Sequence, residues 1–211
     1  MEVIRLKEQY FACNTYIIVQ DGKAIIIDAG ASYATVNEVL SRLGYNVDVV
    51  AILLTHSHFD HIYGLDDYLD KFNCKAYIDG KGVENLNDTE MNYSKYYGEG
   101  FTVQSSKICQ LPNQDVCTID DFKFRVIRTY GHTNDSVCYI FDDIMFSGDT
   151  VFSVAVGRTD LPNSNIDDLH ASLSKLRSIN PPRIVYPGHG RAMSGVEMDN
   201  YIDDYIATCV K

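Results

Sequence analysis

Short apolar runs rich in β-branched residues recur along the first third of the chain and predict strands. They cover residues 2–6, 15–19, 24–28, 49–54 and 75–79. Asp21-Gly22 separates the second run from the third, and this dipeptide is a strong signal for a tight hairpin turn. The run 49–54 contains no polar residue, which is typical of a strand that is buried on both faces of its sheet.

Between these strands, apolar residues recur at helical spacing and predict two amphipathic helices. Their apolar positions are Val36, Val39, Leu40 and Leu43 in the first, and Ile62, Leu65, Leu69 and Phe72 in the second. Ser32 is placed to cap the first helix and Gly44 to end it, while Asp60 and His61 fall at the N-terminus of the second. The order of strands and helices predicts an α/β protein built in layers.

Residues 80–114 are rich in Asn, Gly, Ser and Tyr and carry no clear periodicity. We expect short helices and a loop that lies over the edge of the sheet. Four aromatic residues gather in this segment: Tyr93, Tyr96, Tyr97 and Phe101. They have two interpretations, a wall that contacts the substrate or surface aromatics that cover the core, and the second situation is the more common in proteins.

The second half of the chain repeats the pattern of strands followed by a helix. Strands are predicted at 116–119, 122–127, 137–141, 144–146 and 183–186, with aspartate pairs at 120–121 and 142–143 as turns. A helix over 166–179, capped by Asn165 or Ser164, precedes the last strand, and a closing helix starts at about residue 195. The second half therefore repeats the order of strands and helices of the first half, without detectable sequence repetition.

Composition and charge narrow the function classes. The chain has 211 residues, 45% of them hydrophobic, and no linker or low-complexity segment divides it, so a single domain over 1–211 is predicted. Its net charge of −11, with Lys and Arg dispersed, counts against a nucleic acid as substrate. No apolar stretch approaches the roughly 18 residues of a membrane helix, and the N-terminus lacks a signal-peptide pattern, so a cytoplasmic protein without a membrane anchor is expected.

The cysteines give little sign of a disulfide framework. None of the six forms a Cys-x-x-Cys pair: Cys13, Cys74, Cys109, Cys117, Cys138 and Cys209. In a reducing compartment, small buried thiols are the favoured interpretation. A hairpin bridge between Cys109 and Cys117 is expected only if the protein is secreted.

The strand 49–54 leads directly into a cluster of polar residues, Thr55-His56-Ser57-His58-Phe59-Asp60-His61. This stretch holds three of the six histidines of the chain and one carboxylate. His56 and His58 are two residues apart, so in extended backbone their imidazoles leave on the same side. Imidazole and carboxylate together suit zinc, iron or manganese, although chance crowding of loop histidines produces similar strings.

If this cluster binds a metal ion, further ligands are expected at other strand ends. Three candidates follow predicted strands, His132, Asp149 and His189, and each comes directly after a glycine, which lets the backbone turn tightly. Any one of these dipeptides is more often a simple turn. Together they place five of the six histidines at strand ends, where open α/β sheets bind ligands. The remaining histidine, His170, lies inside the 166–179 helix, where packing is expected.

These motifs resemble those of the metallo-β-lactamase superfamily, and within it the chain looks most like the glyoxalase II branch of hydroxyacylglutathione hydrolases. The matching segments are His56-x-His58-x-Asp60-His61, Gly131-His132, Ser147-Gly148-Asp149, Gly188-His189, Asn14-Thr15-Tyr16, Asp28-Ala29-Gly30 and Val156-Gly157-Arg158-Thr159-Asp160. The resemblance covers almost the whole chain and implies a four-layer αββα sandwich. It also implies a dinuclear site, with His56, His58 and His132 on one ion, Asp60, His61 and His189 on the other, and Asp149 bridging both.

The resemblance further implies two divalent metal ions, zinc in the first place, with iron or manganese as alternatives. The expected reaction is hydrolysis of a thioester of glutathione or another thiol, with a metal-bridging hydroxide as nucleophile and Asp60 as the residue that orients it. Two departures bear on the substrate. Asn134-Asp135 stand where the family usually has Pro-Gly, and the C-terminal helical region that supplies much of the glutathione grip in full-length glyoxalase II is lacking.

Arg158 is the candidate for a contact with the substrate, because a guanidinium suits a carboxylate. An ion pair with Asp160 is equally consistent with the sequence. Specificity is expected in the loops around the site, chiefly 84–114, 133–136 and 151–165.

Other activities share the motif. Persulfide dioxygenases resemble this branch, keep the whole His-x-His-x-Asp-His string and bind one iron, and lactonases and other ester hydrolases also belong to the superfamily. A non-enzymatic, metal-stabilised binding module is disfavoured, because structural zinc sites are closed and often rich in thiolate. A small-molecule thioester or ester is therefore the expected partner of a monomer or homodimer, with no nucleic acid and no membrane involved.

Overall fold

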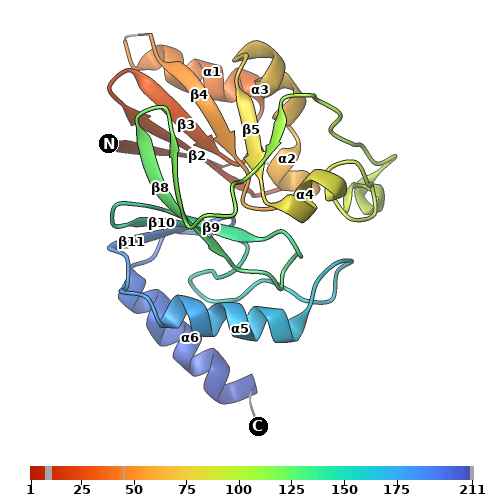
Figure 1. Cartoon of the computed structure of the whole chain (residues 1–211), viewed down its shortest axis with the longest axis vertical. Coiled ribbons are helices and arrows are strands. Elements are labelled where there is room, and N and C mark those ends of the chain that lie inside the picture. Colours follow the sequence, from red (N-terminus) through yellow and green to blue (C-terminus); the bar gives the residue numbers. More distant parts are fainter. Residues whose placement is uncertain (8–10, 45, 210–211) are drawn as a thin grey trace.

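The computed structural model describes residues 1–7, 11–44 and 46–209. Two sheets stack face to face, and helices cover the outer face of each (Figure 1). The first sheet contains, in spatial order, β1 (Glu2–Lys7), β2 (Asn14–Gln20), β3 (Lys23–Ile27), β4 (Asp48–Leu53), β5 (Lys75–Ile78) and β6 (Ile108–Gln110). Its first three strands are antiparallel, and the pairs from β3 to β6 are parallel.

The second sheet has five strands in a mixed arrangement. Their spatial order is β11 (Ile184–Pro187), β10 (Ile144–Gly148), β9 (Val137–Phe141), β8 (Phe122–Arg128) and β7 (Val116–Ile119). β10 and β11 are parallel, and all other neighbours are antiparallel. Both sheets thus combine hairpins with parallel crossovers that need a helix to connect them.

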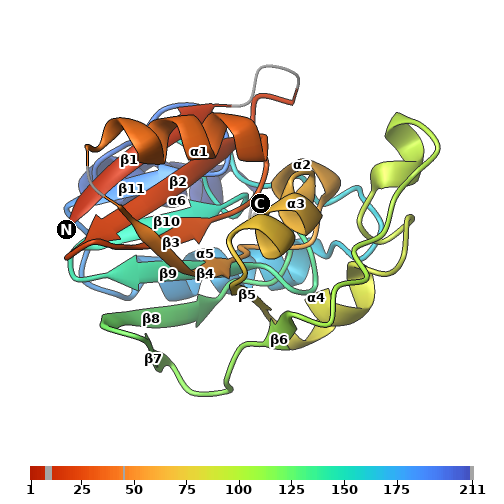
Figure 2. The same cartoon turned by 90° about the horizontal axis from the view of Figure 1, so that it is seen from above.

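The helices complete the predicted four-layer αββα sandwich. α1 (Tyr33–Arg42) and α3 (Leu65–Lys71) lie outside the first sheet, and α5 (Ile166–Arg177) and α6 (Gly195–Cys209) lie outside the second (Figure 1). The shorter helices are α2 (Phe59–Ile62), α4 (Gly80–Asn85) and the 3-10 helix η1 (Ser94–Tyr97), and α2 and α4 lie toward the same side of the sandwich in Figure 2. The fold class expected from the sequence is therefore confirmed.

Alternation along β2 shows how the layers are held together. Ile17 and Val19 pack with the apolar faces of α1 and α3, while Tyr16 and Ile18 pack between the two sheets. Both faces of the strand are buried, which explains the unbroken apolar run from Tyr16 to Val19. A third apolar cluster joins the second sheet to α5 and α6.

Most predicted turns and caps are confirmed. Asp21 and Gly22 both have positive φ (50° and 77°), as the tight hairpin between β2 and β3 requires. The Ser32 side chain accepts from the Thr35 N–H and caps α1. At the start of α5 the cap is Asn165, whose side chain accepts from the backbone of Asp167 and Asp168.

Two predictions in the first half need correction. The continuous helix expected through Ile62 and Phe72 is broken into α2 and α3 at Tyr63-Gly64. Gly64 donates its N–H to the Ala29 carbonyl at 2.7 Å, and a side chain at Gly64 would lie 2.7 Å from the Ala31 carbonyl oxygen. The helix is therefore interrupted where Gly64 packs closely against the loop that follows β3. The segment 80–114 contains α4 and η1 as expected, but it also supplies β6, a strand that the sequence did not reveal.

The six cysteines are free thiols in the structure. Four are buried as expected, whereas Cys109 is partly exposed and Cys209 is exposed, so the prediction of buried thiols is wrong for Cys209. Among the described residues, no helix is long and apolar enough to cross a membrane.

Candidate metal centre

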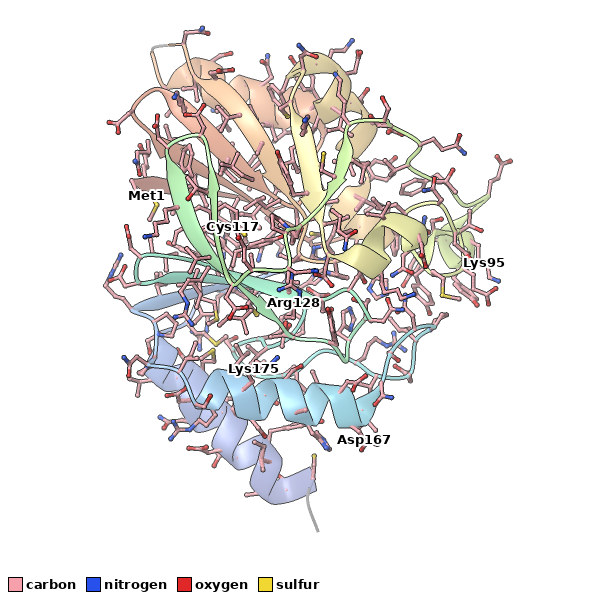
Figure 3. The ribbon with its side chains drawn as sticks, in the orientation of Figure 1. Met1, Lys95, Cys117, Arg128, Asp167 and Lys175 are labelled. Atoms are coloured by element: carbon pink, nitrogen blue, oxygen red, sulfur yellow. The ribbon has the colours of Figure 1, made fainter. Side chains whose placement is uncertain are left out.

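The loops that follow five strands meet at one edge of the sandwich. From the first sheet come the loops after β3 and β4, which carry Asp28 and the 55–61 segment. From the second sheet come the loops after β8, β10 and β11, which carry His132, Asp149 and His189. Lys175 of α5 donates to the Arg128 carbonyl at 2.8 Å and fixes the end of β8 ahead of His132 (Figure 3). The seven predicted metal ligands therefore gather at one edge of the sandwich, where strand ends commonly bind ligands.

The Asn14-Thr15-Tyr16 segment fastens the His189 turn to the first sheet. The Asn14 N–H donates to the Gly188 carbonyl at 2.7 Å, and its side-chain amide donates to the Pro187 carbonyl at 2.9 Å. The Tyr16 hydroxyl donates to the same Pro187 carbonyl at 2.6 Å. This motif thus has a structural role, because it joins two sheets across the site.

Three histidines form the first group of donor atoms. His56, His58 and His132 offer ring nitrogens within 4.8 Å of one another, and His58 Nδ1 lies 3.0 Å from His132 Nε2. Burial holds the pKa of His56 well below its usual range, lowers that of His58 to about 3 and also lowers that of His132. Neutral imidazoles present lone pairs, so this group is suited to hold a cation.

A second group lies beside it and contains Asp60, His61 and His189. His189 Nε2 lies 3.1 Å from Asp60 Oδ2, and His61 Nε2 lies 3.8 Å from the same atom. Asp149 stands between the two groups, with Oδ1 3.4 Å from His61 Nε2 and Oδ2 3.6 Å from His132 Nε2. These distances bring the seven candidate donors together, and their division into two ligand sets that share Asp149 stays a prediction from the resemblance.

The electrostatics of the second group differ from those of the first. Burial disfavours a charged His61, but the Cys13 sulfur, Asp149 and Asp28 outweigh it and hold the pKa of His61 well above its usual range. Burial also opposes charge on His189, and Asp149 with Asp60 nevertheless raises its pKa. Carboxylates crowded against histidines therefore create a negative environment that a metal cation would neutralise.

Unpaired buried atoms test whether a metal ion fits these residues. In the described part of the chain, four site atoms are buried without any hydrogen-bond partner: His56 Nε2, His58 Nε2, His61 Nε2 and Asp149 Oδ1. Buried polar atoms in proteins are nearly always paired, so four unpaired atoms at one place require an explanation. A metal ion bound among them supplies it, and a donor set of imidazole nitrogens and carboxylate oxygens suits zinc and related divalent ions.

Close approach of the backbone explains the glycines that precede the site residues. A Cβ on Gly188 would lie 2.1 Å from Asp149 Oδ1 and 2.6 Å from His61 Cε1. At Gly157 a Cβ would lie 2.8 Å from the Cβ of His132. Any side chain at these positions would displace a donor residue.

Two residues at the site were not identified from the sequence. Asp28 is buried, and its Oδ2 lies 2.7 Å from His61 Nδ1. Its position in Asp28-Ala29-Gly30, directly after a strand, was the available signal. Cys13 offers its sulfur within 4.8 Å of donor atoms of Asp60 and His61, and burial raises the pKa of its thiol to about 12. Only the pairing of distant strands places Cys13 there.

The remaining sequence candidates are also placed by the structure. His170 is half-buried on α5, with its ring 5.9 Å from that of Tyr205, so the expectation of packing is confirmed. Arg158 is exposed and forms a bidentate ion pair with Asp160, with both N–O distances 2.7 Å. In the 133–136 loop, Asn134 accepts from the Asn85 side chain at 2.8 Å and Asp135 is fully buried.

A cavity of about 330 Å³ opens onto the two donor groups. Its lining residues are Phe11, His58, Phe59, Asp60, Tyr93, Tyr97, His132, Asp149, Arg158, Leu161 and His189. The volume suits a small molecule, and the polar donors lie together with aromatic walls, as in many ligand sites. The arrangement therefore gives a bound molecule direct access to any metal ion held there.

Comparisons with known proteins agree with this geometry. A sequence profile described as the metallo-beta-lactamase superfamily matches residues 10–189. A probable metallo-hydrolase of Methanocaldococcus jannaschii is 33% identical over 197 residues, covering 89% of this chain and 92% of the relative. A probable polyketide biosynthesis zinc-dependent hydrolase of Bacillus subtilis, PksB, is 27% identical over 189 residues, with coverage of 88% and 76%. The crystal structure of the BLEG-1 B3 metallo-beta-lactamase superposes with a TM-score of 0.88 at 30% identity, covering 94% of this chain and 97% of that one.

Proposed function

The chain belongs to the metallo-beta-lactamase superfamily, and on that premise we propose that it is a metal-dependent hydrolase of thioesters or other esters of small molecules. The observation that carries this proposal is the set of buried, unpaired donor atoms at the base of an open cavity. A structural metal site would be closed by protein on all sides. Here Asp60, Asp149 and His189 belong to the donor groups and also line the cavity.

Seven residues would hold two divalent ions, with zinc as the first choice and iron or manganese as alternatives. The proposed sets are His56, His58 and His132 for one ion, Asp60, His61 and His189 for the other, and Asp149 shared by both. Their support is the geometry of the two donor groups and the similarity to PksB of B. subtilis, a probable zinc-dependent hydrolase. When bound, the metal ions would lower the pKa of a coordinated water and polarise the carbonyl of the substrate.

The protein groups have separate tasks in this proposal. Asp60 lines the cavity and would accept a hydrogen bond from the attacking water. This contact would direct a lone pair of the water oxygen at the carbonyl carbon of the substrate. The Asp28 carboxylate accepts from His61 Nδ1 and holds that ring in place. Arg158 lines the cavity, and Asp160 engages one side of its guanidinium. The other side of the guanidinium would bind a carboxylate on the substrate.

Amide hydrolysis of a β-lactam is the second candidate. It is favoured by the similarity to the BLEG-1 B3 metallo-beta-lactamase, which is 30% identical to this chain. The same orientation of water and carbonyl would serve an ester or a strained amide. A chromogenic cephalosporin in the substrate panel separates the two candidates.

The test begins with metal analysis of the purified protein, followed by assays of thiol release from a thioester panel led by S-lactoylglutathione. We expect two equivalents of metal and hydrolysis that is lost after dialysis against a chelator and restored by zinc. His56→Ala and Asp149→Ala should each lose metal and activity together. Retained hydrolysis in a metal-free variant would overturn the proposal. Oxygen uptake with a thiol persulfide, on protein that contains one iron, would instead identify a dioxygenase.

A further inference from the structure

Four aromatic side chains form a continuous wall along the cavity: Phe11, Phe59, Tyr93 and Tyr97, called the aromatic rim below. Ring centroids are 5.0 Å apart for Phe11 and Phe59, 4.3 Å for Phe59 and Tyr97, and 5.8 Å for Tyr93 and Tyr97. At the inner end, the ring of Tyr93 lies 5.9 Å from that of His58. The rim therefore reaches from the donor cluster to the solvent-exposed side of the cavity.

Hydrogen bonds join the aromatic rim to α2, the helix that carries Asp60 and His61. The Phe59 N–H donates to the carbonyl of Asn92 at 2.8 Å, and Asn92 is fully buried. The Asn92 side chain donates to the Phe101 carbonyl at 2.8 Å, which closes the segment on itself. Lys95 marks the outer part of this segment (Figure 3). The two tyrosines are thus held by the same backbone that positions Asp60, next to Phe59 in α2.

The conformation of Tyr93 is a further sign of a built wall. Its φ is +65°, in the left-handed region that bulky residues rarely adopt. Such strain persists only where the surrounding structure imposes it, and it concentrates at ligand sites. Asn163 on the opposite loop donates to the Met91 carbonyl at 3.3 Å, so both walls of the cavity are tied together.

The exposed fractions of the rim side chains favour a wall that contacts the substrate over a cover for the core. Phe59 is 7% exposed, but Tyr97, which stacks on it at an interplanar angle of 26°, is 61% exposed. A cover would bury its outer ring. Apart from the donor residues, Arg158 is the charged residue among those that line the cavity, and Asp160 already pairs with it. The open surface is therefore mainly aromatic, and Asp160 pairs with one side of the guanidinium beside it.

We propose that the aromatic rim selects thioesters or esters that carry an aromatic or similarly planar apolar group on one side of the reacting bond. This inference rests on the proposed function and specifies its substrate class. A carbonyl placed at the donor groups puts such a substituent beside Tyr93 and Tyr97, where offset or edge-to-face ring contacts are favourable. A small hydroxyacyl group on a polar peptide thiol would leave this surface unused.

The test uses matched substrates on the zinc-loaded enzyme. Three N-acetylcysteamine thioesters vary the acyl group: acetyl, cyclohexylacetyl and phenylacetyl. Two acetyl thioesters vary the thiol: ethanethiol and benzyl mercaptan. In one of the two sets, we expect the aromatic substrate to have a kcat/KM at least tenfold above that of the small substrate. If the planar ring lies on the acyl side, the kcat/KM of the phenylacetyl thioester should also exceed that of the cyclohexylacetyl thioester. No aromatic preference in either set would overturn the proposal.

Variants at Tyr97 assign the preference to the rim. Tyr97→Ala should lower the aromatic-to-small ratio of kcat/KM about tenfold, whereas Tyr97→Phe should keep it. Tyr205→Ala, an aromatic deletion on α6 away from the cavity, should leave the ratio unchanged. Metal content and thermal unfolding of each variant verify folding. An unchanged ratio in Tyr97→Ala would contradict the role of the rim.

A binding measurement separates this inference from the proposed hydrolysis. The thioether S-benzyl-N-acetylcysteamine cannot be hydrolysed, and its S-methyl counterpart lacks the ring. Calorimetry should show tighter binding of the benzyl compound to wild type and loss of that difference in Tyr97→Ala. That result, in a protein that hydrolyses no thioester, would support the rim while refuting the hydrolase. Equal binding of both thioethers would refute the rim whatever the activity.

Discussion

The Asp28 carboxylate lies 2.7 Å from Nδ1 of His61, and both side chains are buried. Thr55 donates its backbone N–H and its hydroxyl to the same carboxylate, at 2.7 and 2.8 Å. Because the carboxylate accepts the Nδ1 proton, loss of the second ring proton would leave the lone pair on Nε2, which faces Asp149 at 3.4 Å. A single buried acid thus fixes both the orientation and the tautomer of a proposed metal ligand.

Asp28→Asn tests this relationship with little change in shape. Asparagine tolerates the φ of +60° found at this position, but it removes the charge that fixes the His61 ring. We expect zinc affinity to fall by about 10–100-fold, measured by competition with a chromophoric chelator. Asp48→Asn, an exposed aspartate at the start of β4, is the control and should bind as wild type does. Unchanged affinity in Asp28→Asn would mean that the carboxylate only packs.

Gly188→Ala tests the close approach of backbone to donor atoms. The new methyl group would lie 2.1 Å from Asp149 Oδ1 and 2.6 Å from His61 Cε1, so both donors must move. We expect metal content after gel filtration to fall well below one equivalent. Gly190→Ala is the matched control: its φ is +78° and no atom lies within 4 Å of the added group. It should cost about 1 kcal/mol of unfolding free energy and retain metal.

Asp135 predicts a pH dependence of stability that does not involve the donor groups. Burial raises its pKa to about 6, with partial compensation from Thr133 and Ser57. Between pH 4 and 6 the folded protein holds a proton that the unfolded chain releases, so this residue lowers stability as the pH rises and contributes a constant penalty above pH 6.

Asp135→Asn should remove that penalty. Relative to wild type, we expect the variant to gain about 2–3 kcal/mol more at pH 7.5 than at pH 4, because each pKa unit corresponds to about 1.4 kcal/mol. Urea unfolding of both proteins in excess chelator gives the difference, in which the titration of the histidines cancels. A difference that does not change with pH would show that Asp135 ionises at its ordinary pKa.

Arg158 and Asp160 form an exposed ion pair, and the proposed substrate contact of Arg158 predicts an effect on binding rather than on stability. Arg158→Gln should raise KM about five- to tenfold for a thioester that bears a carboxylate and leave kcat nearly unchanged, because the lost contact is the same before and during the reaction. The unfolding free energy should change by less than about 1 kcal/mol. Steady-state kinetics with a carboxylate substrate and its methyl ester test this. An equal rise of KM for both would exclude recognition of the carboxylate.

The sequence predicted the parts of the fold that depend on local pattern. Alternating burial, the Asp21-Gly22 turn and the Ser32 cap act over a few residues, and each is found in the structure. β6 escaped detection because three residues become a strand only by pairing with β5. The break at Gly64 escaped because its cause is the Ala29 carbonyl from a distant loop.

The candidate site divides in the same way. By itself the sequence determined the family and predicted the candidate donor residues, which are imidazoles and carboxylates that follow predicted strands. Only the tertiary structure decided which donors share a group, that Asp28 and Cys13 lie behind His61, and that Phe11 joins the tyrosines of the 80–114 segment in one rim. The physical reason is that coordination, orientation and the shape of a cavity depend on distances between segments far apart along the chain. Those distances are set by the packing of the two sheets.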